Sequence, residues 1–166
     1  MRILLMIFTL VGATGAYALD SAPKEIGKFT DWAAYEASEN GAKVCWMVTT
    51  PKKSLPTNVN RGEIFMMVAH RPNDKVFNEL NVIIGYPFKP EASAFGSIDN
   101  KKYRLVTKDD AAWLASPEET DALIKDMRRG MEVIVKGTST RGTDTTDTFS
   151  LRGFTKANRA ITQACQ

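Results

Sequence analysis

The chain has 166 residues, of which 43% are hydrophobic and 25% are charged, so it is long and apolar enough to bury one core. Its net charge is +3, and its basic residues are interleaved with acidic ones along the whole chain. Nucleic-acid-binding proteins usually concentrate their basic residues, so this distribution argues against that class.

The N-terminus carries the pattern of a secretory signal peptide. Arg2 precedes the apolar run Ile3–Val11, which is too short to span a bilayer, and Ala16–Ala18 forms a small-x-small cleavage site. A retained N-terminal anchor is the alternative. No other segment is apolar enough to cross a membrane, so we expect a protein that is periplasmic, associated with the outer membrane or secreted. The predicted organisation is a cleaved signal peptide (1–18), a flexible lead-in (19–27) and a single β-sandwich domain (28–166).

The first half of the domain reads as strands. Lys28–Glu36 places Phe29, Trp32 and Tyr35 three residues apart, which suits a helix as well as a strand. We favour a strand because the next segment, Lys43–Thr50, looks like its partner. Apolar residues occupy both the odd and the even positions of that segment, as in a strand that is covered on both faces.

Further strands alternate with turns and loops. The polar residues 51–61 predict a loop, and Met66 and Met67 in the next strand are expected to fill the core. Turns are expected at 71–75 and at the proline-containing segment 86–90, which stops the preceding strand. The strands expected in this region are 62–70, 79–85, 94–99 and 102–107.

The clearest helix signal begins at Ser116. Ser116 can act as N-cap, Pro117 suits the first helical position, and Glu119 completes a capping box. Apolar side chains recur at helical spacing up to Met127, and Gly130 suits the helix end.

The C-terminal segment organises the chain. Met131, Val133 and Val135 share one strand parity, and Phe149 and Leu151 repeat the pattern after a turn at 141–145. These strands form a predicted β-hairpin. Thr155 can then cap a helix whose apolar face carries Ala157, Ala160, Ile161 and Ala164, followed by Cys165. In total, about seven or eight short strands at regular spacing predict a mainly β, antiparallel sandwich with two short helices.

The two cysteines are predicted to form a disulfide. Cys45 and Cys165 are an even pair in an exported chain, and their bond would close a loop of about 120 residues. A redox or metal role is the alternative. No CxxC motif is present, however, and the single histidine, His70, cannot complete a zinc site with two thiols unless carboxylates join.

Catalytic patterns are missing from the sequence. It has no GxSxG, no HExxH and no glycine-rich phosphate loop. The side chains of the adjacent acids at 109–110 and 118–119 point in different directions, so we expect them to be solvated or to cap a helix rather than to share a proton. His70 could act as a base only if a nucleophile met it in space, and we expect it to be exposed or at a strand end. We therefore predict no catalytic residues, no metal site and no cofactor.

Two segments, the hairpin tip at 141–145 and the proline turn at 86–90, are candidates for a contact surface, because their sequences predict exposed and ordered turns. A solvated tip and a turn that covers the edge of the core are simpler interpretations. The hairpin tip could also bind an anion through its arginine. The candidate contact residues are Tyr86, Pro87, Phe88, Arg141, Gly142 and Asp144.

Several short motifs occur together in an order that carries a family resemblance. They are FTDW at Phe29–Trp32, Cys45 in its strand, Arg61-Gly62, GYPF at Gly85–Phe88, Ala112-Trp113, Met127–Gly130, Val135–Gly137, Arg141–Thr143, Ser150–Phe154 and Ala164-Cys165. The chain resembles the invasion-associated locus B family of exported bacterial proteins. The resemblance implies an immunoglobulin-like β-sandwich, export and, for the family's namesake, a part in entry into host cells. It offers no catalytic residues, and its two cysteines carry over as a structural pair.

Two classes of function follow. The first is a non-enzymatic protein-binding or host-interaction factor with an unknown protein partner in the envelope or on a host cell. The alternative is a periplasmic small-ligand binder or hydrolase whose site is assembled from scattered residues. A concave pocket that holds His70 or a buried carboxylate would favour the alternative, and a filled core would favour the first class.

Overall fold

The computed structural model describes residues 20 and 22–166, so the predicted signal peptide lies outside the described residues. This part of the chain forms a mainly antiparallel β domain with two α-helices, α1 (Pro117–Met127) and α2 (Phe154–Ala164), and a short 3₁₀ turn, η1 (Pro72–Asp74). The strands are β1 (Lys24–Phe29), β2 (Trp32–Glu39), β3 (Ala42–Thr49), β4 (Lys53–Leu55), β5 (Phe65–Arg71), β6 (Val76–Ile83), β7 (Ala94–Ile98), β8 (Lys101–Lys108), β9 (Ala111–Trp113), β10 (Glu132–Thr138) and β11 (Asp144–Ser150).

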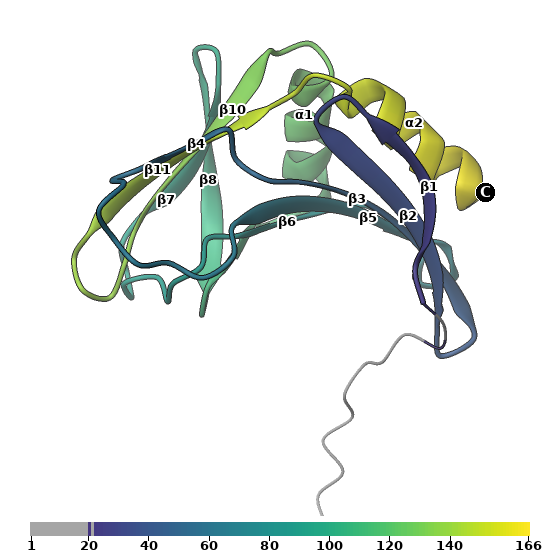
Figure 1. Ribbon diagram of the computed structural model, residues 1–166, viewed down its shortest axis with the longest axis horizontal. Coiled ribbons are helices and arrows are strands. Elements are labelled where there is room, and N and C mark those ends of the chain that lie inside the picture. The colour runs from purple at the N-terminus through teal and green to yellow at the C-terminus, as the bar shows by residue number, and fades with distance from the viewer. Residues whose placement is uncertain (1–19, 21) are drawn as a thin grey trace, which may run out of the picture.

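All 11 strands join one hydrogen-bonded run in the order β1-β2-β3-β5-β6-β9-β8-β7-β10-β11-β4. Strand β8 links its two halves, because residues 101–105 pair with β7 and residues 106–108 pair with β9. Figure 1 shows the result as an arch, with β1, β2, β3, β5 and β6 in one half and β4, β7, β10 and β11 in the other. The predicted antiparallel β class with two helices is confirmed. The immunoglobulin-like detail stays a prediction, since this strand order does not establish it.

Helix α2 covers one face of the first half of the sheet and is tied there by the disulfide. Its Phe154 ring meets Trp32 edge-on, with ring centroids 5.1 Å apart, and both side chains are buried. The predicted Cys45–Cys165 bond is confirmed, with a Cα–Cα distance of 6.0 Å. The helix is not capped by Thr155 as predicted. Gly153 takes the N-cap position at φ 92°, a left-handed conformation that favours glycine.

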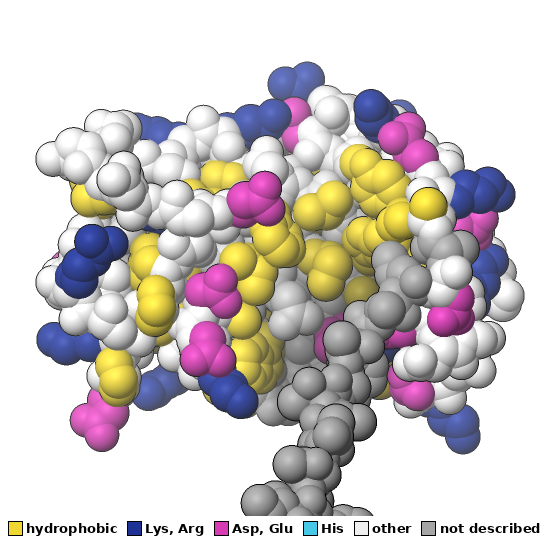
Figure 2. All heavy atoms as spheres, turned by 60° about the horizontal axis from the view of Figure 1, so that its bottom comes forward, with side chains coloured by type: hydrophobic (Ala, Val, Ile, Leu, Met, Phe, Trp, Pro, Cys, Tyr) yellow, Lys and Arg dark blue, Asp and Glu magenta, His cyan; other side chains and the backbone are white. Residues whose placement is uncertain are grey.

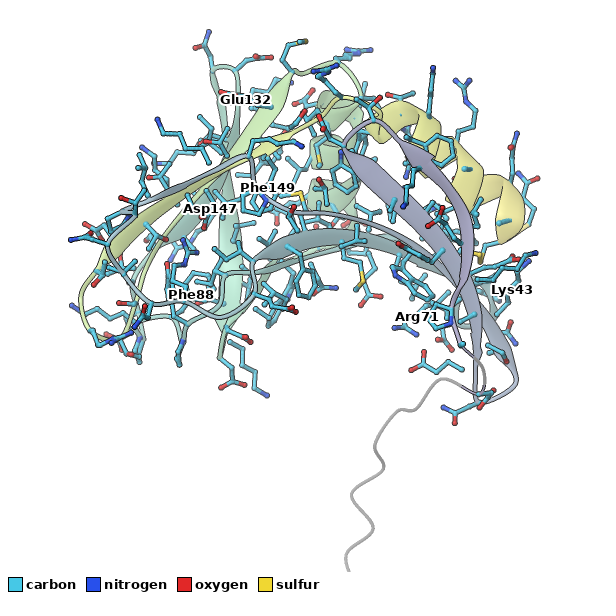
Figure 3. All side chains as sticks on the ribbon, viewed as in Figure 1. Lys43, Arg71, Phe88, Glu132, Asp147 and Phe149 are labelled. Carbon is cyan, nitrogen blue, oxygen red and sulfur yellow. A yellow bond between two sulfur atoms is a disulfide. The ribbon has the colours of Figure 1, made fainter. Side chains whose placement is uncertain are left out.

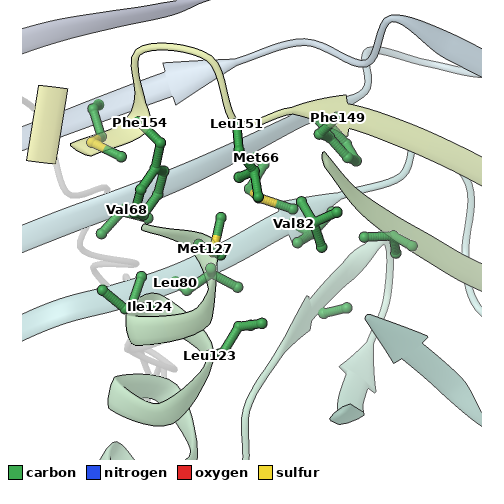
Figure 4. Packing of buried hydrophobic residues seen from close by; sticks show 14 of the residues in the cluster. Met66, Val68, Leu80, Val82, Leu123, Ile124, Met127, Phe149, Leu151 and Phe154 are labelled. Carbon is green, nitrogen blue, oxygen red and sulfur yellow. The ribbon is translucent and has the colours of Figure 1, made fainter. Parts of the chain in front are cut away.

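Helix α1 packs on strand β6, between the two halves of the sheet (Figure 1). Ser116 is its N-cap, as predicted, and accepts a hydrogen bond from the Glu119 backbone N–H at 3.2 Å. Its buried side chains Leu123, Ile124 and Met127 lie over residues of β5 and β6, as Figure 4 shows. Both helices lie on the convex side of the arch in the described part of the chain (Figure 1), so the main core is on that side.

Four expectations about local structure were wrong. The single strand expected at 28–36 crosses the turn between β1 and β2, where Phe29 pairs with Trp32. Strand β1 begins at Lys24, inside the predicted lead-in, because it forms a hairpin with β2. The backbone hydrogen bonds of this hairpin leave no pattern in a polar sequence. The predicted loop 51–61 contains β4, which pairs with the edge of β11. Met131 is 72% exposed because β10 begins one residue later, whereas Val133 and Val135 are buried as predicted.

Candidate functional site

The proline turn and the hairpin end, predicted as separate candidates, lie against each other. The Lys89 N–H donates to the Thr138 carbonyl at 2.8 Å, and the Thr140 N–H donates to the Pro87 carbonyl at 3.0 Å. Phe88 and Ser139 form an isolated β-bridge between the two segments. The turn therefore extends the edge of the β10–β11 hairpin, and the two candidates form one surface.

The expected exposure of this surface was only half right. Pro87, Arg141, Gly142 and Asp144 are exposed, whereas Tyr86 and Phe88 retain only 6% and 7% of their accessible surface. Their rings lie 5.8 Å apart at the core edge, where a side chain at Gly137 would meet the Phe88 ring. These two aromatic rings anchor the turn at the edge of the core, as the simpler interpretation of the proline turn predicted, and they do not stand exposed as contact residues.

A buried ion pair lies directly behind this surface. Arg61 Nη1 and Nη2 donate to the two carboxylate oxygens of Asp147 at 2.8 and 2.6 Å. Arg61 Nε and Nη2 also donate to the Ile84 carbonyl at 3.0 and 2.7 Å. The side chains are only 7% and 1% exposed, and the guanidinium stacks over the Tyr86 ring at 5.0 Å. Figure 3 places Asp147 and Phe88 in the same half of the arch.

Next to the ion pair is a pocket of about 240 Å³. Its walls come from the loop before β5, the proline turn and the hairpin end. The lining residues are Asn58, Val59, Asn60, Arg61, Tyr86, Ser139, Arg141, Thr143 and Thr145. Of the residues predicted for the contact surface, Tyr86 and Arg141 line this pocket. Thr143 and Thr145 also belong to the predicted hairpin tip at 141–145, whereas residues 58–61 and Ser139 were not predicted as site residues.

A second candidate surface lies on the concave face of strands β2, β3, β5 and β6. Strand pairing places Tyr35 beside Trp46 and Val48 beside Met67, so these side chains share the face opposite helix α2. The Tyr35 and Trp46 rings stack with centroids 5.7 Å apart. All four side chains are half-buried. Figure 2, which brings the underside of the arch forward, shows hydrophobic side chains gathered across its middle. We call this surface the concave face.

The concave face continues into a shallow hollow of about 630 Å³. Phe65 and Ile83, which face each other on β5 and β6, form its apolar floor. Glu63, Asp109 and Asp110 stand at its edge. The hollow thus has an apolar floor and an acidic border.

His70 lies near the end of strand β5, as one half of its prediction had it, but it is a core residue and not an exposed one. It is 1% exposed, and its Nδ1 accepts a hydrogen bond from the Asn78 backbone N–H at 3.0 Å. Nδ1 also lies 3.1 Å from the Ala69 carbonyl, and Nε2 lies 3.0 Å from the Thr162 hydroxyl, which donates to the Asn158 carbonyl. Burial lowers the pKa of His70, and nearby Arg128 lowers it further. The ring is neutral and both of its nitrogens are occupied.

No group of three or more His, Cys, Asp and Glu side chains within residues 20 and 22–166 is arranged to hold a metal ion. Neither helix of that part has the length and apolar composition needed to cross a membrane. The fold and these surfaces define a mainly antiparallel β domain that is closed by one disulfide and carries a polar pocket and an apolar concave face.

Comparison with known proteins places this domain in a family. The family model described as "Invasion associated locus B (IalB) protein" matches residues 32–162. The chain belongs to the IalB family. No curated protein matches it. Among solved structures, it is similar to the crystal structure of invasion associated protein b from Bartonella henselae, with 15% identity and a TM-score of 0.58 over 87% of this chain and 97% of that one. Family membership and the disulfide are consistent with a location outside the cytoplasm.

Proposed function

We propose that this protein is an exported, non-enzymatic binding protein of the bacterial envelope that engages another protein through its concave face. It acts in the periplasm or at the cell surface, and its partner belongs to the envelope or to a host cell. The observation that carries the proposal is that β3, β5 and the first half of β2 carry apolar side chains on both faces, whereas helix α2 covers one face in the described part of the chain.

An antiparallel sheet with one solvated face usually alternates apolar and polar side chains. Here the second face carries aromatic, aliphatic and methionine side chains instead. Contiguous apolar patches of this kind mark interaction sites on soluble proteins. The stacked pair Tyr35 and Trp46 has the composition of an interface anchor, since such aromatic residues often contribute most of the binding energy.

The border of the hollow indicates the chemistry of the partner. Glu63, Asp109 and Asp110 flank an apolar floor, so the complementary segment presents apolar side chains next to Lys or Arg. Such charges add orientation and a faster encounter to the affinity supplied by the apolar contacts.

Two observations support this function over the hydrolase alternative. The His70 nitrogens are both hydrogen-bonded in the core, so this ring has no free lone pair for a substrate. Both oxygens of the buried Asp147 carboxylate are held by Arg61. A general base needs an accessible lone pair within hydrogen-bond reach of the proton it removes, and neither group offers one in this arrangement.

Crosslinking in living cells tests the proposal. A photoreactive phenylalanine analogue at Met67 should form an adduct with a defined partner, whereas the same probe at the exposed Met131 should not. Mass spectrometry should map the adduct to a segment with apolar residues beside Lys or Arg. Adding Trp46→Ser to the Met67 probe should abolish it. No adduct at Met67, or equal adducts at both positions, would overturn the proposed function.

A further inference from the structure

The polar pocket between residues 58–61, Tyr86 and the hairpin end adjoins the hollow of the concave face at Tyr86 but has its own chemistry. We propose that it binds the oxyanion group of a small molecule, either a carboxylate or a phosphate. The proposal does not depend on the protein-binding function, because Ser139, Arg141 and the asparagine side chains that carry it do not line the hollow of the concave face, although Tyr86 lines both.

The charge of the pocket favours an anion. Arg61 is neutralised by Asp147, whose two oxygens are both engaged in that ion pair. Arg141 also lines the pocket, and within the described residues it forms no ion pair. Neither Asp nor Glu is among the lining residues. One positive charge therefore faces the pocket without a compensating carboxylate.

Hydrogen-bond donors converge on the same space. Ser139 is 4% exposed and its Oγ accepts the Thr143 N–H at 3.1 Å, which leaves the hydroxyl hydrogen available. Arg61 has five N–H groups and uses four of them on Asp147 and Ile84, so one on Nη1 remains. The side-chain amides of Asn58 and Asn60 make no hydrogen bond within the part of the chain that the structure describes.

The walls are held in place before any ligand arrives. The Tyr86 and Thr145 hydroxyls are hydrogen-bonded at 2.5 Å, and the Tyr86 ring is stacked under the Arg61 guanidinium. Ser139 is fixed by backbone hydrogen bonds with Thr143 and Gly142 across the turn. A site whose donors are already ordered loses less entropy on binding than a flexible one.

The size of the pocket limits the ligand. Drug-sized ligands occupy pockets of about 300–1,000 Å³. A volume of about 240 Å³ is smaller and equals the space of about eight water molecules. It accommodates one oxyanion group with a short carbon skeleton.

Titration followed by NMR tests the assignment, with inorganic phosphate and citrate as separate probes against a sodium chloride control. We expect saturable shifts confined to the amides of the pocket, with a dissociation constant on the order of 1 mM for the better probe. The better probe identifies the oxyanion as phosphate or carboxylate.

Two matched variants complete the test. Arg141→Gln should weaken binding about ten-fold or more, because it removes a charge-assisted hydrogen bond. Arg104→Gln, an equal charge change at an exposed residue of β8 outside the pocket, should leave binding unchanged. Ser139→Ala should also weaken binding. No saturable shift with either probe, or equal weakening by Arg141→Gln and Arg104→Gln, would overturn the proposal.

Discussion

The buried Arg61–Asp147 pair allows a quantitative test of how the pocket region is built. Replacing Arg61 with methionine keeps an unbranched apolar stem but removes the guanidinium, with its charge and its donors. The Asp147 carboxylate, 1% exposed, then has no partner, and the Ile84 carbonyl loses both of its side-chain donors. The variant Arg61→Met should therefore be strongly destabilised.

The magnitude follows from the two losses. An uncompensated buried charge costs about 3–5 kcal/mol. The unsatisfied Ile84 carbonyl adds about 1 kcal/mol. The free energy of unfolding should fall by about 4–6 kcal/mol in Arg61→Met. The double variant R61M/D147L removes both charges, so its loss should be only about 2 kcal/mol or less.

Urea unfolding of the purified domain, followed by far-ultraviolet circular dichroism, measures these differences. Arg104→Met serves as the control, because Arg104 is exposed and its replacement should change stability by less than about 0.5 kcal/mol. The reasoning would be refuted if Arg61→Met cost less than about 1 kcal/mol, or if the double variant were as unstable as the single one.

Three further predictions concern the core. Reducing the Cys45–Cys165 bond, which closes a separation of 120 residues, should lower the free energy of unfolding by up to about 5 kcal/mol in urea, and a loss below about 1 kcal/mol would contradict this. Burial lowers the pKa of His70 from 6.5, so the contribution of the neutral ring to stability is complete above pH 6.5 and is lost as the pH falls toward the folded-state pKa. The urea midpoint of His70→Gln should therefore depend less on pH in that window than the midpoint of the unchanged protein. An equal pH dependence of the two midpoints would count against this reasoning. Gly153→Ala should lower the melting temperature markedly, because the new Cβ would strike the Phe29 carbonyl at a φ of 92°; an unchanged value would be inconsistent with the structure.

The sequence predicted those parts of the fold that depend on local pattern or on covalent chemistry. The hairpin β10–β11 and the helix capped by Ser116 follow from spacing and capping residues, and both are present. Cys45 and Cys165 were paired correctly, because an exported chain with two cysteines allows one intramolecular pairing. Strands β1 and β4 were missed, since their residues are polar and pairing with distant segments stabilises them.

The candidate site was harder to predict, because its residues meet only in the folded chain. Asp147 has the same strand parity as the buried Phe149, so the alternating pattern already placed this carboxylate on the core side. Arg61, which neutralises it, is 86 residues away in sequence, and the Arg61-Gly62 motif indicates the family but not this pairing. The proline turn was interpreted more simply as a cover for the edge of the core, and the burial of Tyr86 and Phe88 agrees with that interpretation rather than with exposed aromatic contacts.

The most direct test of the central claim is oxidative footprinting of the concave face in intact cells and in the purified protein. Met67 lies on the concave face, whereas Met131, at 72% exposure, supplies an internal control away from it. A bound partner should slow the oxidation of Met67 and of the Tyr35–Trp46 pair in cells relative to the purified protein, and Met131 should react equally in both. Equal oxidation of Met67 in both settings would contradict a protein partner on this face.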